Sequence, residues 1–568
     1  SVPEEAWIAL EEFEETSDAY SSGEASYLAR GKEIKVSTTT KTFSGTEIPR
    51  VSLPSTEDWG ERLEWIRSEN VPGKYPFTAG VFPFKREDEI PLRMFAGLGS
   101  AESTNKRFHY LTKDQPFNRL STAFDSVTLY GLDATDERMD VFSKICESGV
   151  SISNVDEMER LFEGFDLCAP NTSVSLTING PYWAILAFYF KTAIRQQLKL
   201  FEEENGREPS EEEASEISAR TLKICRGSCQ SDQYKEVVGG QNTTLFNLAN
   251  ALKMMTDVTE YYVANDIRNH YFVSISGYHI DEAGANPITQ AALTLSHGFS
   301  YLEMFRARGL DPEVFLRNFS WFLSLSMDPE YSVLGRVCRR IWAIALRDLY
   351  GIEQERNLKL KYHVQGSGRS LHAQETSFND FRSILQALYA LQDNANSLHT
   401  NSLDEALSLP TREAALLALR SQQVIAHETG IANHVDPLGG SYFVERLTRD
   451  MEEGAHEYFQ QIDDLGGMVE AIEAGFPQRE VASSAYRFQQ EVEAGERQVV
   501  WVNAFADKSD TSVNTLYIDE GTSAEQCTQL DELRKGRDTA AVTGALDRLR
   551  QTAQGSKNLM PPILDAVR

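Results

Sequence analysis

Residues 173–178 read SVSLTI, and this short run holds the pattern that decides the predicted fold. Hydroxyl side chains stand at Ser173, Ser175 and Thr177, with apolar side chains between them. Such alternation predicts a β-strand with one polar and one apolar face. Residues 273–276, which read VSIS, repeat the alternation with Ser274 and Ser276. We therefore expect strands whose two faces meet different surroundings.

Strand-like runs recur along the chain and are separated by helix-length spacers. We count eight: MFAGL near Phe95, RLSTAFD near Leu120, VSISN near Ser151, SVSLTI near Ser173, ICRGSCQ near Cys225, YFVSISGYH near Ser274, SWFLSLS near Ser324 and YHVQGSG near His363. Strands that alternate with helices predict a parallel α/β architecture, and eight of them predict a (β/α)8 TIM-type barrel.

The hydroxyl residues are unusual for such a barrel. The outward face of each strand packs against helices and has to be apolar, so the Ser and Thr side chains are expected to point inward. Barrels of this type normally fill their interior with Val, Ile and Leu, a volume that small hydroxyl side chains cannot occupy. A lumen threaded by a long polar ligand explains the pattern. A water-filled barrel, or one with a shifted strand register, is the alternative.

Three regions follow from these patterns. Residues 1–70 are predicted to form an irregular, extended arm, and residues 71–370 the barrel. Residues 371–568 are predicted to be helical, because runs such as TREAALLALRSQQVIAHETG place apolar residues at helical spacing. These helices are expected to pack on the barrel and to lead to a subunit interface.

The formal charge of -30 argues against a nucleic-acid partner, which would need clustered Lys and Arg. No apolar stretch approaches the ~20 residues that cross a bilayer, and the acidic N-terminal residues do not resemble a secretory signal. We expect a cytoplasmic protein without a membrane partner. Its cysteines are expected to be free thiols and not a zinc site: Cys146, Cys168, Cys225, Cys229, Cys338 and Cys527.

Several polar residues stand at predicted strand ends, where barrel active sites lie. His279 follows one strand, and Gln230 and Gln365 end two others. These neutral donors and acceptors suit the orientation of a carbonyl better than hydrolysis, although a lone histidine is more often structural. In HTNSLDEAL (residues 399–407), Asn401 and Glu405 would share one face of a helix. A capping pattern is the alternative there.

Long motifs carry a resemblance to a known family: YPFTAGVFPFKR, MFAGLGSAESTNKRF, RLSTAFDSVTLYG, SVSLTINGP, SISGYHIDEAGANPITQ, YHVQGSGRSLHAQE, SLHTNSLDEALSLP and VDPLGGSYFVE. In this order they resemble the large, substrate-binding subunit of the methylmalonyl-CoA mutase family, closest to its isobutyryl-CoA mutase branch. The resemblance extends from about Thr46 to the C-terminus. It implies a radical isomerase that uses adenosylcobalamin, with coenzyme A as part of the substrate threading a split barrel.

The resemblance also implies roles for individual residues. His279 would hydrogen-bond the thioester carbonyl, Gln230 would contact the acyl group, and Tyr75 would stack near the cobalamin. Asn401 and Glu405 would hold the adenosyl ribose, and Glu282 would lie against the corrin. The expected CoA path is lined by Ser121, Ser173, Ser175, Thr177, Ser320 and Gln365.

Three positions bear on the substrate. Phe95 stands where methylmalonyl enzymes have Tyr, and Gln241 stands where they have Arg, so a second carboxylate would lack partners. Ala123 stands where a 2-hydroxyisobutyryl enzyme would have Asp. Isobutyryl-CoA, isomerised to n-butyryl-CoA, fits best. Pivalyl-, isovaleryl- and methylmalonyl-CoA mutases are the alternatives, and a non-catalytic acyl-CoA-binding subunit is the alternative of another class.

The sequence contains no DxHxxG motif, which carries the cobalt-ligating histidine in this family, and no P-loop. We therefore expect a separate small cobalamin-binding subunit in an α2β2 heterotetramer, with residues 1–70 touching the partner. A separate G-protein chaperone is expected to load the cofactor.

Overall fold

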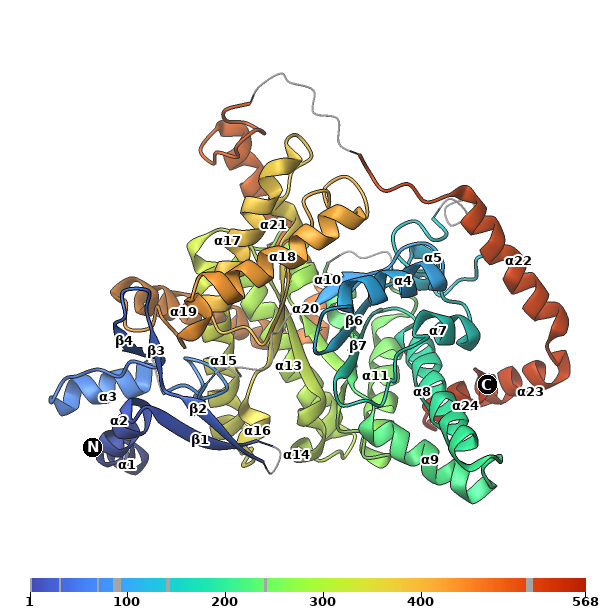
Figure 1. The fold of residues 1–568 in the computed structure, drawn as a ribbon, viewed down its shortest axis with the longest axis horizontal. Helices are drawn as coiled ribbons and strands as arrows, with labels where there is room; N and C mark the ends of the chain where they lie inside the picture. The colour runs from blue at the N-terminus through green and yellow to red at the C-terminus, as the bar shows by residue number, and fades with distance from the viewer. Residues whose placement is uncertain are drawn as a thin grey trace.

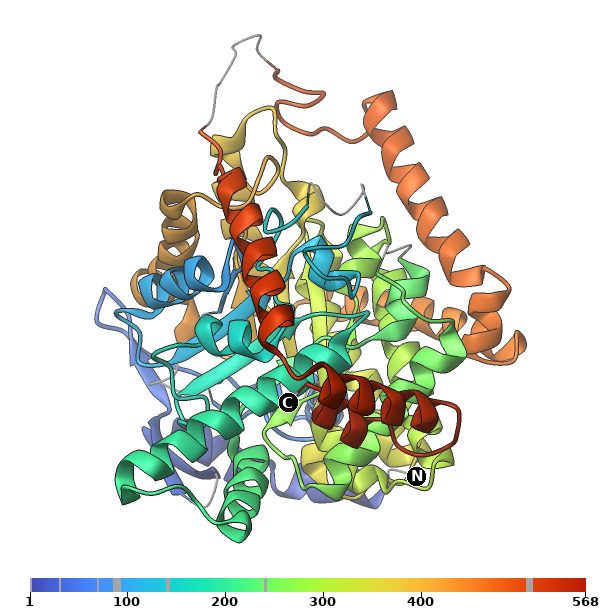
Figure 2. The same ribbon diagram turned by 90° about the vertical axis from the view of Figure 1, so that its right-hand side faces the viewer.

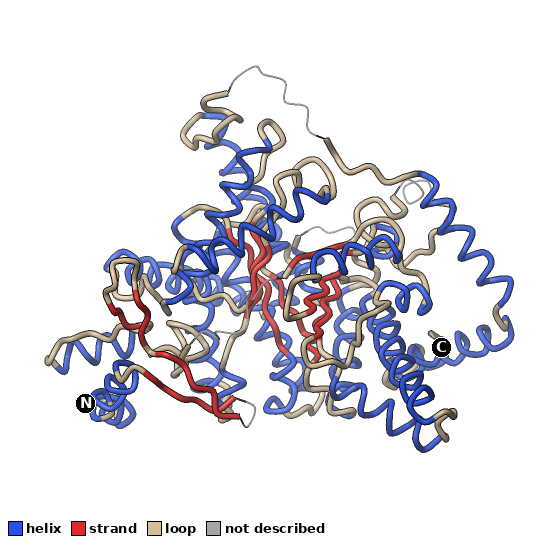
Figure 3. The backbone as a smooth tube through the Cα atoms, viewed as in Figure 1, coloured by secondary structure: helices blue, strands red, loops and turns tan. Residues whose placement is uncertain are grey.

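The computed structural model describes residues 3–29, 32–68, 71–84, 93–138, 144–239, 243–506 and 514–567. Parallel strands occupy the centre, helices surround them, and a small antiparallel region lies to one side with the N-terminus (Figures 1 and 3). The fold is therefore of the α/β class, as the alternating pattern predicts.

Two parallel sheets form the centre. The first has the order β5-β6-β7-β8-β9, with β5 Met94–Ala96, β6 Asn118–Ala123, β7 Thr172–Thr177, β8 Gly227–Cys229 and β9 His270–Tyr271. The second has the order β10-β11-β12-β13, with β10 Val273–Ser276, β11 Phe319–Leu325, β12 Tyr362–Gly366 and β13 Ser397–His399. Only Phe272 separates β9 from β10. At the other end, the Arg93 backbone N–H donates to the carbonyl oxygen of Leu398 at 3.3 Å, which links β13 to the start of β5.

Helices occupy the connections between the strands and follow β13. Those before β13 are α4 Ala101–Thr112, α5 Ser126–Leu129, α7 Val155–Leu161, α8 Tyr182–Asn205, α9 Glu211–Ile224, α10 Gln233–Val238, α11 Leu248–Ala264, α12 Tyr278–Glu282, α13 Pro287–Ala307, α14 Pro312–Phe315, α15 Leu334–Ile344, α16 Glu355–Leu358 and α17 Asn379–Gln392. Those after β13 are α18 Arg412–Glu428, α19 Tyr442–Asp464, α20 Met468–Glu473, α21 Phe476–Ala494, α22 Glu520–Gly536, α23 Thr539–Ala553 and α24 Met560–Ala566. The last three cross one side of the molecule, where α24 packs against α8 (Figure 2). Within the described ranges, no helix is long and apolar enough to cross a membrane.

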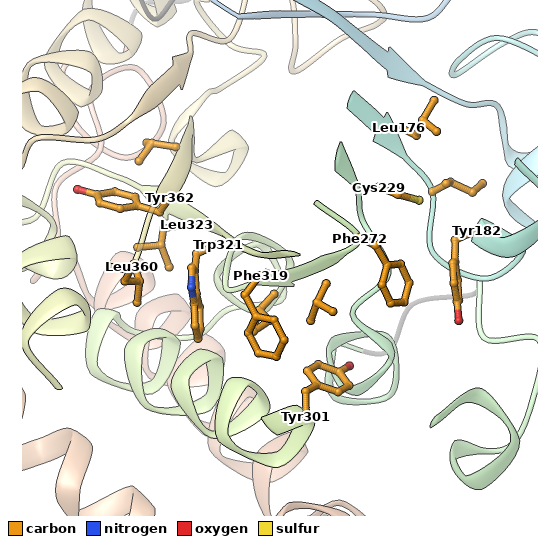
Figure 4. Close-up of a cluster of buried hydrophobic side chains, with 14 of the residues drawn as sticks. Leu176, Tyr182, Cys229, Phe272, Tyr301, Phe319, Trp321, Leu323, Leu360 and Tyr362 are labelled. Carbon is orange, nitrogen blue, oxygen red and sulfur yellow. The ribbon is translucent and has the colours of Figure 1, made fainter. Parts of the chain in front are cut away.

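The main core lies between the strands and the helices. Figure 4 shows side chains from β8 and β11, such as Cys229 and Trp321, close to helix side chains such as Tyr182 and Tyr301. The Trp321 ring lies 4.7 Å from that of Trp342 on α15. A Cβ atom added to Gly298 of α13 would stand 2.3 Å from the Trp321 ring. Glycine therefore lets α13 approach β11 closely enough to bury the indole.

One predicted strand is wrong and one strand was missed. The run near Ser151 makes only isolated bridges, at Val150. The Asn154 side chain then accepts from the Glu157 backbone N–H and starts α7, so the chain turns into a helix before a strand can extend.

The missing strand is β13, which lies beyond Gly368 in the region predicted to be helical. Its three residues are too few to show a period of two.

The prediction of an irregular arm for residues 1–70 is also wrong. This region contains α1 Glu4–Glu11, α2 Phe13–Ser21 and α3 Trp59–Ser68, with two antiparallel pairs, β1 Glu24–Ala29 with β2 Lys32–Ser37 and β3 Thr39–Lys41 with β4 Glu47–Pro49. A separate small core stabilises it, formed by Tyr20, Val36, Val51, Val71 and Phe84. The strands β3 and β4 have three residues each, too few for a period of two to show in the sequence.

Replacement of Trp321 by Ala is expected to lower the free energy of unfolding by about 3–5 kcal/mol, because it leaves a cavity between β11 and its covering helices. Urea denaturation followed by circular dichroism measures the change. Leu349→Ala is the matched control, because that side chain is 77% exposed. Equal unfolding midpoints for the two variants would contradict the packing described here.

Candidate functional site

Four of the predicted site residues gather at one edge of the sheets. Gln230 follows β8, Gln365 lies near the end of β12, Asn401 follows β13, and His279 follows β10 within α12. The carboxyl ends of parallel strands meet at one edge, and this is why residues so far apart in sequence approach each other.

The turn into α12 depends on Gly277. A Cβ atom at this position would lie 2.5 Å from Thr294 Oγ1 and 2.9 Å from Gln290 Cγ, both on α13. Any other residue would push the turn away from α13 and displace His279, two residues further on. The sequence SISGYH therefore sets the place of the imidazole through backbone packing.

His279 is held by two polar side chains. Ser276 Oγ lies 2.8 Å from Nδ1, and Lys235 Nζ lies 3.0 Å from Nδ1 and 3.1 Å from Nε2. Burial, reinforced by the Lys235 charge, lowers the pKa of His279 well below its ordinary value. The imidazole is therefore neutral at pH 7, as the predicted carbonyl-orienting role requires. Sequence reasoning missed Lys235, which stands five residues after Gln230 in an ordinary helical pattern.

Tyr278 connects the polar residues on the other side of the site. Gln365 Nε2 donates to Tyr278 Oη at 3.2 Å and to Asn401 Oδ1 at 3.3 Å. Asn401 Nδ2 in turn donates to the Gly366 carbonyl oxygen at 2.8 Å. Glu282 and Glu405 are both close enough to Tyr278 to raise its pKa further above normal, after burial as the main cause. Tyr278 therefore belongs to the site, although sequence analysis did not single it out.

The expected helix at 399–407 is absent. Residues 403–407 form successive turns, in which the Glu405 N–H donates to Ser402 and the Leu407 N–H to Asp404. Asn401 is buried, whereas Glu405 is exposed. The pair thus reaches the same edge through a loop and not through one helical face.

Glu282 joins α12 to the loop after β12. Its carboxylate accepts from the Ser367 hydroxyl at 3.0 Å and from the Gly368 N–H at 2.7 Å. Burial, with the neighbouring Asp281 charge, raises the pKa of Glu282 to about 7. This carboxyl therefore changes its charge near neutral pH.

Phe95 lies in a wall of rings. Its centroid is 6.5 Å from that of Phe322, 5.8 Å from His363 and 5.0 Å from His399. Burial lowers the pKa of His399 to about 4 and that of His363 well below normal. Both imidazoles are therefore neutral at pH 7, and the surroundings of Phe95 offer no positive charge from these rings.

The serines predicted to line a lumen share one face of the first sheet. Phe95, Ser121, Ser175 and Ser228 stand opposite one another across β5, β6, β7 and β8. The residues between them, such as Val174, belong to the main core on the other face. The period-two hydroxyls therefore point away from the helices, as predicted.

An arginine that sequence analysis missed reaches this polar face. Arg93 Nη1 donates to Ser121 Oγ at 2.9 Å, and Nη2 lies 3.5 Å from Ser173 Oγ. Burial and the nearby Arg119 charge lower the pKa of Arg93 to about 9. A cation held among hydroxyls suits an anionic or strongly polar ligand.

Some polar atoms on β7, after β8 and on β11 lack protein partners. Among the described residues, Thr177 Oγ1, Gln230 Oε1 and Ser320 Oγ are buried without a hydrogen bond. An unpaired buried polar atom is costly, so such atoms are normally satisfied by water or a ligand. The three atoms belong to residues assigned to substrate contact.

Two predicted site residues do not join the group. The Tyr75 ring lies under the Arg347 guanidinium, 3.6 Å from its centroid, and its hydroxyl lies 3.4 Å from Asp348. Arg347 and Asp348 follow α15 and precede β12, so Tyr75 lies at the amino edge of the strands, opposite His279. Gln241 lies outside the described residues.

Comparison with known proteins gives the family. The family model described as methylmalonyl-CoA mutase matches residues 41–203 and 213–568. The chain therefore belongs to the methylmalonyl-CoA mutase family, as its motifs indicate.

Named relatives add detail. The chain is 48% identical to the fused isobutyryl-CoA mutase of Nocardia farcinica over 568 residues, which is all of this chain and 53% of that protein. It is 47% identical to the protein of the same name from Geobacillus kaustophilus, over 98% of this chain and 52% of that protein. The 2-hydroxyisobutanoyl-CoA mutase large subunit of Aquincola tertiaricarbonis is 33% identical over 88% of this chain and 84% of that protein. The chain spans about half the length of the fused relatives.

Replacement of Glu282 by Gln is expected to change how stability depends on pH. Because the folded-state pKa of about 7 lies above the ordinary value of 4.5, the folded protein binds more protons between these pH values. Its free energy of unfolding therefore falls as pH rises. Relative to the Gln variant, the wild type should lose about 1–2 kcal/mol between pH 5 and pH 8, a partial value because the carboxyl is not fully buried.

Urea denaturation at several pH values measures this difference. Glu212→Gln, on the exposed face of α9, is the matched control. A constant difference between wild type and Glu282→Gln across this pH range would contradict the assignment.

Proposed function

We propose that this chain is the acyl-CoA-binding part of an adenosylcobalamin-dependent acyl-CoA mutase, an isomerase that interconverts isobutyryl-CoA and n-butyryl-CoA. One observation carries the proposal. A polar face with unpartnered atoms at Thr177, Gln230 and Ser320 leads to the neutral imidazole of His279. This arrangement suits a long polar carrier whose reactive end needs to be oriented and not hydrolysed.

We infer that the two parallel sheets are halves of one (β/α)8 barrel threaded by coenzyme A. The single residue between β9 and β10 supports this at one junction, and the Arg93–Leu398 backbone hydrogen bond supports it at the other. The CoA path is then lined by Ser121, Ser173, Ser175, Thr177, Ser320 and Gln365. The stacking of Tyr75 near the cobalamin stays a prediction.

The chain's own residues position and shield the substrate. His279 donates to the thioester carbonyl oxygen, and the free Oε1 of Gln230 faces the acyl group. The rings of Phe95 and Phe322 exclude water from the reacting carbons. None of these groups is a strong base, so the protein contributes orientation more than proton transfer.

The carboxyl edge offers groups that fit the cofactor. Glu405 is exposed there, and Asn401 lies beside Gln365 and Tyr278. Their carboxylate and amide suit ribose hydroxyls, and we propose that they hold the adenosyl group while Glu282 lies against the corrin. Adenosylcobalamin, when bound, supplies the radical chemistry by homolysis of its cobalt–carbon bond.

The surroundings of Phe95 argue for a substrate with no second carboxylate. Phe95 offers no hydroxyl, and the neutral His363 and His399 offer no charge. The cation near these rings, Arg93, donates to Ser121 and lies 3.5 Å from Ser173 on the proposed CoA path, so the argument concerns a second carboxylate beyond its reach. Gln241, by its sequence identity alone, adds no charge either. An unpaired carboxylate in such a site would cost several kcal/mol, on the order of a buried lone charge. This argument disfavours methylmalonyl-CoA.

We also propose that the cobalamin is held mainly by residues outside this sequence, because it contains no DxHxxG motif. The names and lengths of the fused relatives argue against the separate small subunit that the sequence led us to expect. The same names argue against an α2β2 assembly that contains such a subunit. The G-protein chaperone stays a prediction.

The decisive test incubates isobutyryl-CoA with the chain and adenosylcobalamin, in the dark and without oxygen. The chain is supplied alone, joined to a cobalamin-binding domain in one polypeptide, or with a separate cobalamin-binding subunit of the same organism. Gas chromatography of n-butyrate after thioester hydrolysis gives the turnover. Parallel reactions contain methylmalonyl-, pivalyl-, isovaleryl- and 2-hydroxyisobutyryl-CoA.

Fastest turnover of isobutyryl-CoA, dependent on the cobalamin-binding part, is the expected result. Faster turnover of another acyl-CoA would overturn the substrate assignment. Binding of acyl-CoA and cofactor without any turnover would favour a non-catalytic acyl-CoA-binding subunit.

The double replacement Phe95→Tyr and Gln241→Arg is expected to lower kcat/KM for isobutyryl-CoA at least about tenfold, equivalent to about 1.4 kcal/mol. It introduces polar groups that an unsubstituted acyl chain leaves unpaired, and methylmalonyl-CoA should become a better substrate relative to isobutyryl-CoA. Phe381→Tyr, at a 65% exposed position on α17, is the control. Unchanged selectivity would show that Phe95 and Gln241 do not form the acyl pocket.

A further inference from the structure

A bulky ring stands among the small side chains on the inward face of β11. Trp321 and Leu323 of this strand pack into the main core. Alternation turns the residues beside and between them to the other face, which therefore carries Ser320, Phe322 and Ser324. The Phe322 side chain is only 3% exposed. A buried phenyl ring on a face of hydroxyls calls for a reason why it lies there.

Other rings hold Phe322 in place. Tyr278 stacks on it, with the centroids 5.0 Å apart and the planes at 11°. Phe95 lies 6.5 Å away at 27°, and His363 lies 5.1 Å away at 36°. Because β5 and β11 belong to different sheets, the rings of Phe95 and Phe322 meet across the interior between them. A ring packed against so many neighbours has little freedom to move aside and forms a fixed wall.

The strand register places this wall between the proposed CoA path and the imidazole. Ser274 is paired with Ser320, and Ser276 with Phe322, across β10 and β11. Among the described residues, Ser320 Oγ is buried without a hydrogen bond, two residues nearer the amino edge. Ser276 Oγ lies 2.8 Å from His279 Nδ1, and the His279 and Phe322 centroids are 6.2 Å apart. A carrier that follows the serines thus reaches the ring where its thioester would meet the imidazole.

We propose that Phe322 is a specificity-determining residue, a fixed wall that limits how many methyl groups the α-carbon of the acyl chain can carry. An extra substituent turned toward Phe322 has to displace one of the stacked rings, and overpacking of a close-packed site is unfavourable. Isobutyryl-CoA, with two methyl groups on this carbon, fits, whereas pivalyl-CoA, with three, is excluded. The inference rests on the proposed function, because it needs an acyl-CoA along the polar face.

The first test measures binding to the chain alone, without cobalamin. Isothermal titration calorimetry compares free CoA, isobutyryl-CoA and pivalyl-CoA. The wild type should bind isobutyryl-CoA more tightly than pivalyl-CoA. Phe322→Leu keeps an apolar side chain and opens space, so the ratio of the two dissociation constants should shift toward pivalyl-CoA. The expected shift is at least about tenfold, the scale on which an apolar pocket discriminates one methylene group.

Free CoA is the internal reference, because it has no acyl group to meet the ring, and its affinity should not change. If Phe322→Leu loses this affinity, Phe322→Met, which is closer to phenylalanine in volume, takes its place. Phe443→Leu, at a 61% exposed position on α19, is the matched control and should leave all three affinities unchanged. An unchanged ratio in a variant that still binds free CoA would overturn the proposal. Equal affinities of the wild type for the two acyl-CoAs would also overturn it.

The second test measures turnover by the wild type and by Phe322→Leu, each supplied with adenosylcobalamin and the cobalamin-binding part. The kcat/KM for pivalyl-CoA relative to isobutyryl-CoA should rise at least about tenfold in the variant. An unchanged ratio of kcat/KM would overturn the role of Phe322 in selectivity. A wild type that binds both acyl-CoAs but isomerises none would refute the mutase function, and the binding ratios would still decide the role of the wall. A wild type that binds no CoA would refute both.

Discussion

The period of two along parallel strands is the constraint on which the rest of the structure depends. Every second side chain meets the helices, so residues such as Val174 and Trp321 are apolar and buried. The alternate side chains are then free to serve a ligand. Ser175 and Ser228, whose hydroxyls lie 3.0 Å apart, illustrate how small and polar that face is. One face therefore contributes apolar burial, and the other presents small polar side chains.

Buried charges fix the amino edge of the sheets. Arg339 donates to the carbonyl oxygens of Phe77 and Thr78, to the Asp393 carbonyl oxygen and to Tyr362 Oη. It thereby holds the segment after Tyr75 against the starts of β12 and β13. This network holds Tyr75 at the amino edge, whereas His279 lies at the carboxyl edge.

The candidate site could be predicted where a residue stands at a strand end. His279, Gln230 and Gln365 were found in this way, because polar residues after apolar strands are conspicuous in the sequence. Lys235 and Arg93 were missed. Lys235 stands in an ordinary helical pattern and Arg93 stands just before a strand, and neither context shows that the side chain is buried. Their importance comes from distances between elements, which no local pattern records.

By itself, the sequence determined the α/β class, the two-faced strands and the family, because these depend on local alternation and on long contiguous motifs. Only the tertiary structure decided that β13 is the last strand, that the N-terminal elements share a small core with Val71 and Phe84, and that Tyr75 lies opposite His279. The physical reason is the same in each case. A three-residue strand, a small satellite core and a buried arginine network are stabilised by partners distant in sequence, and such long-range contacts leave almost no trace in local periodicity.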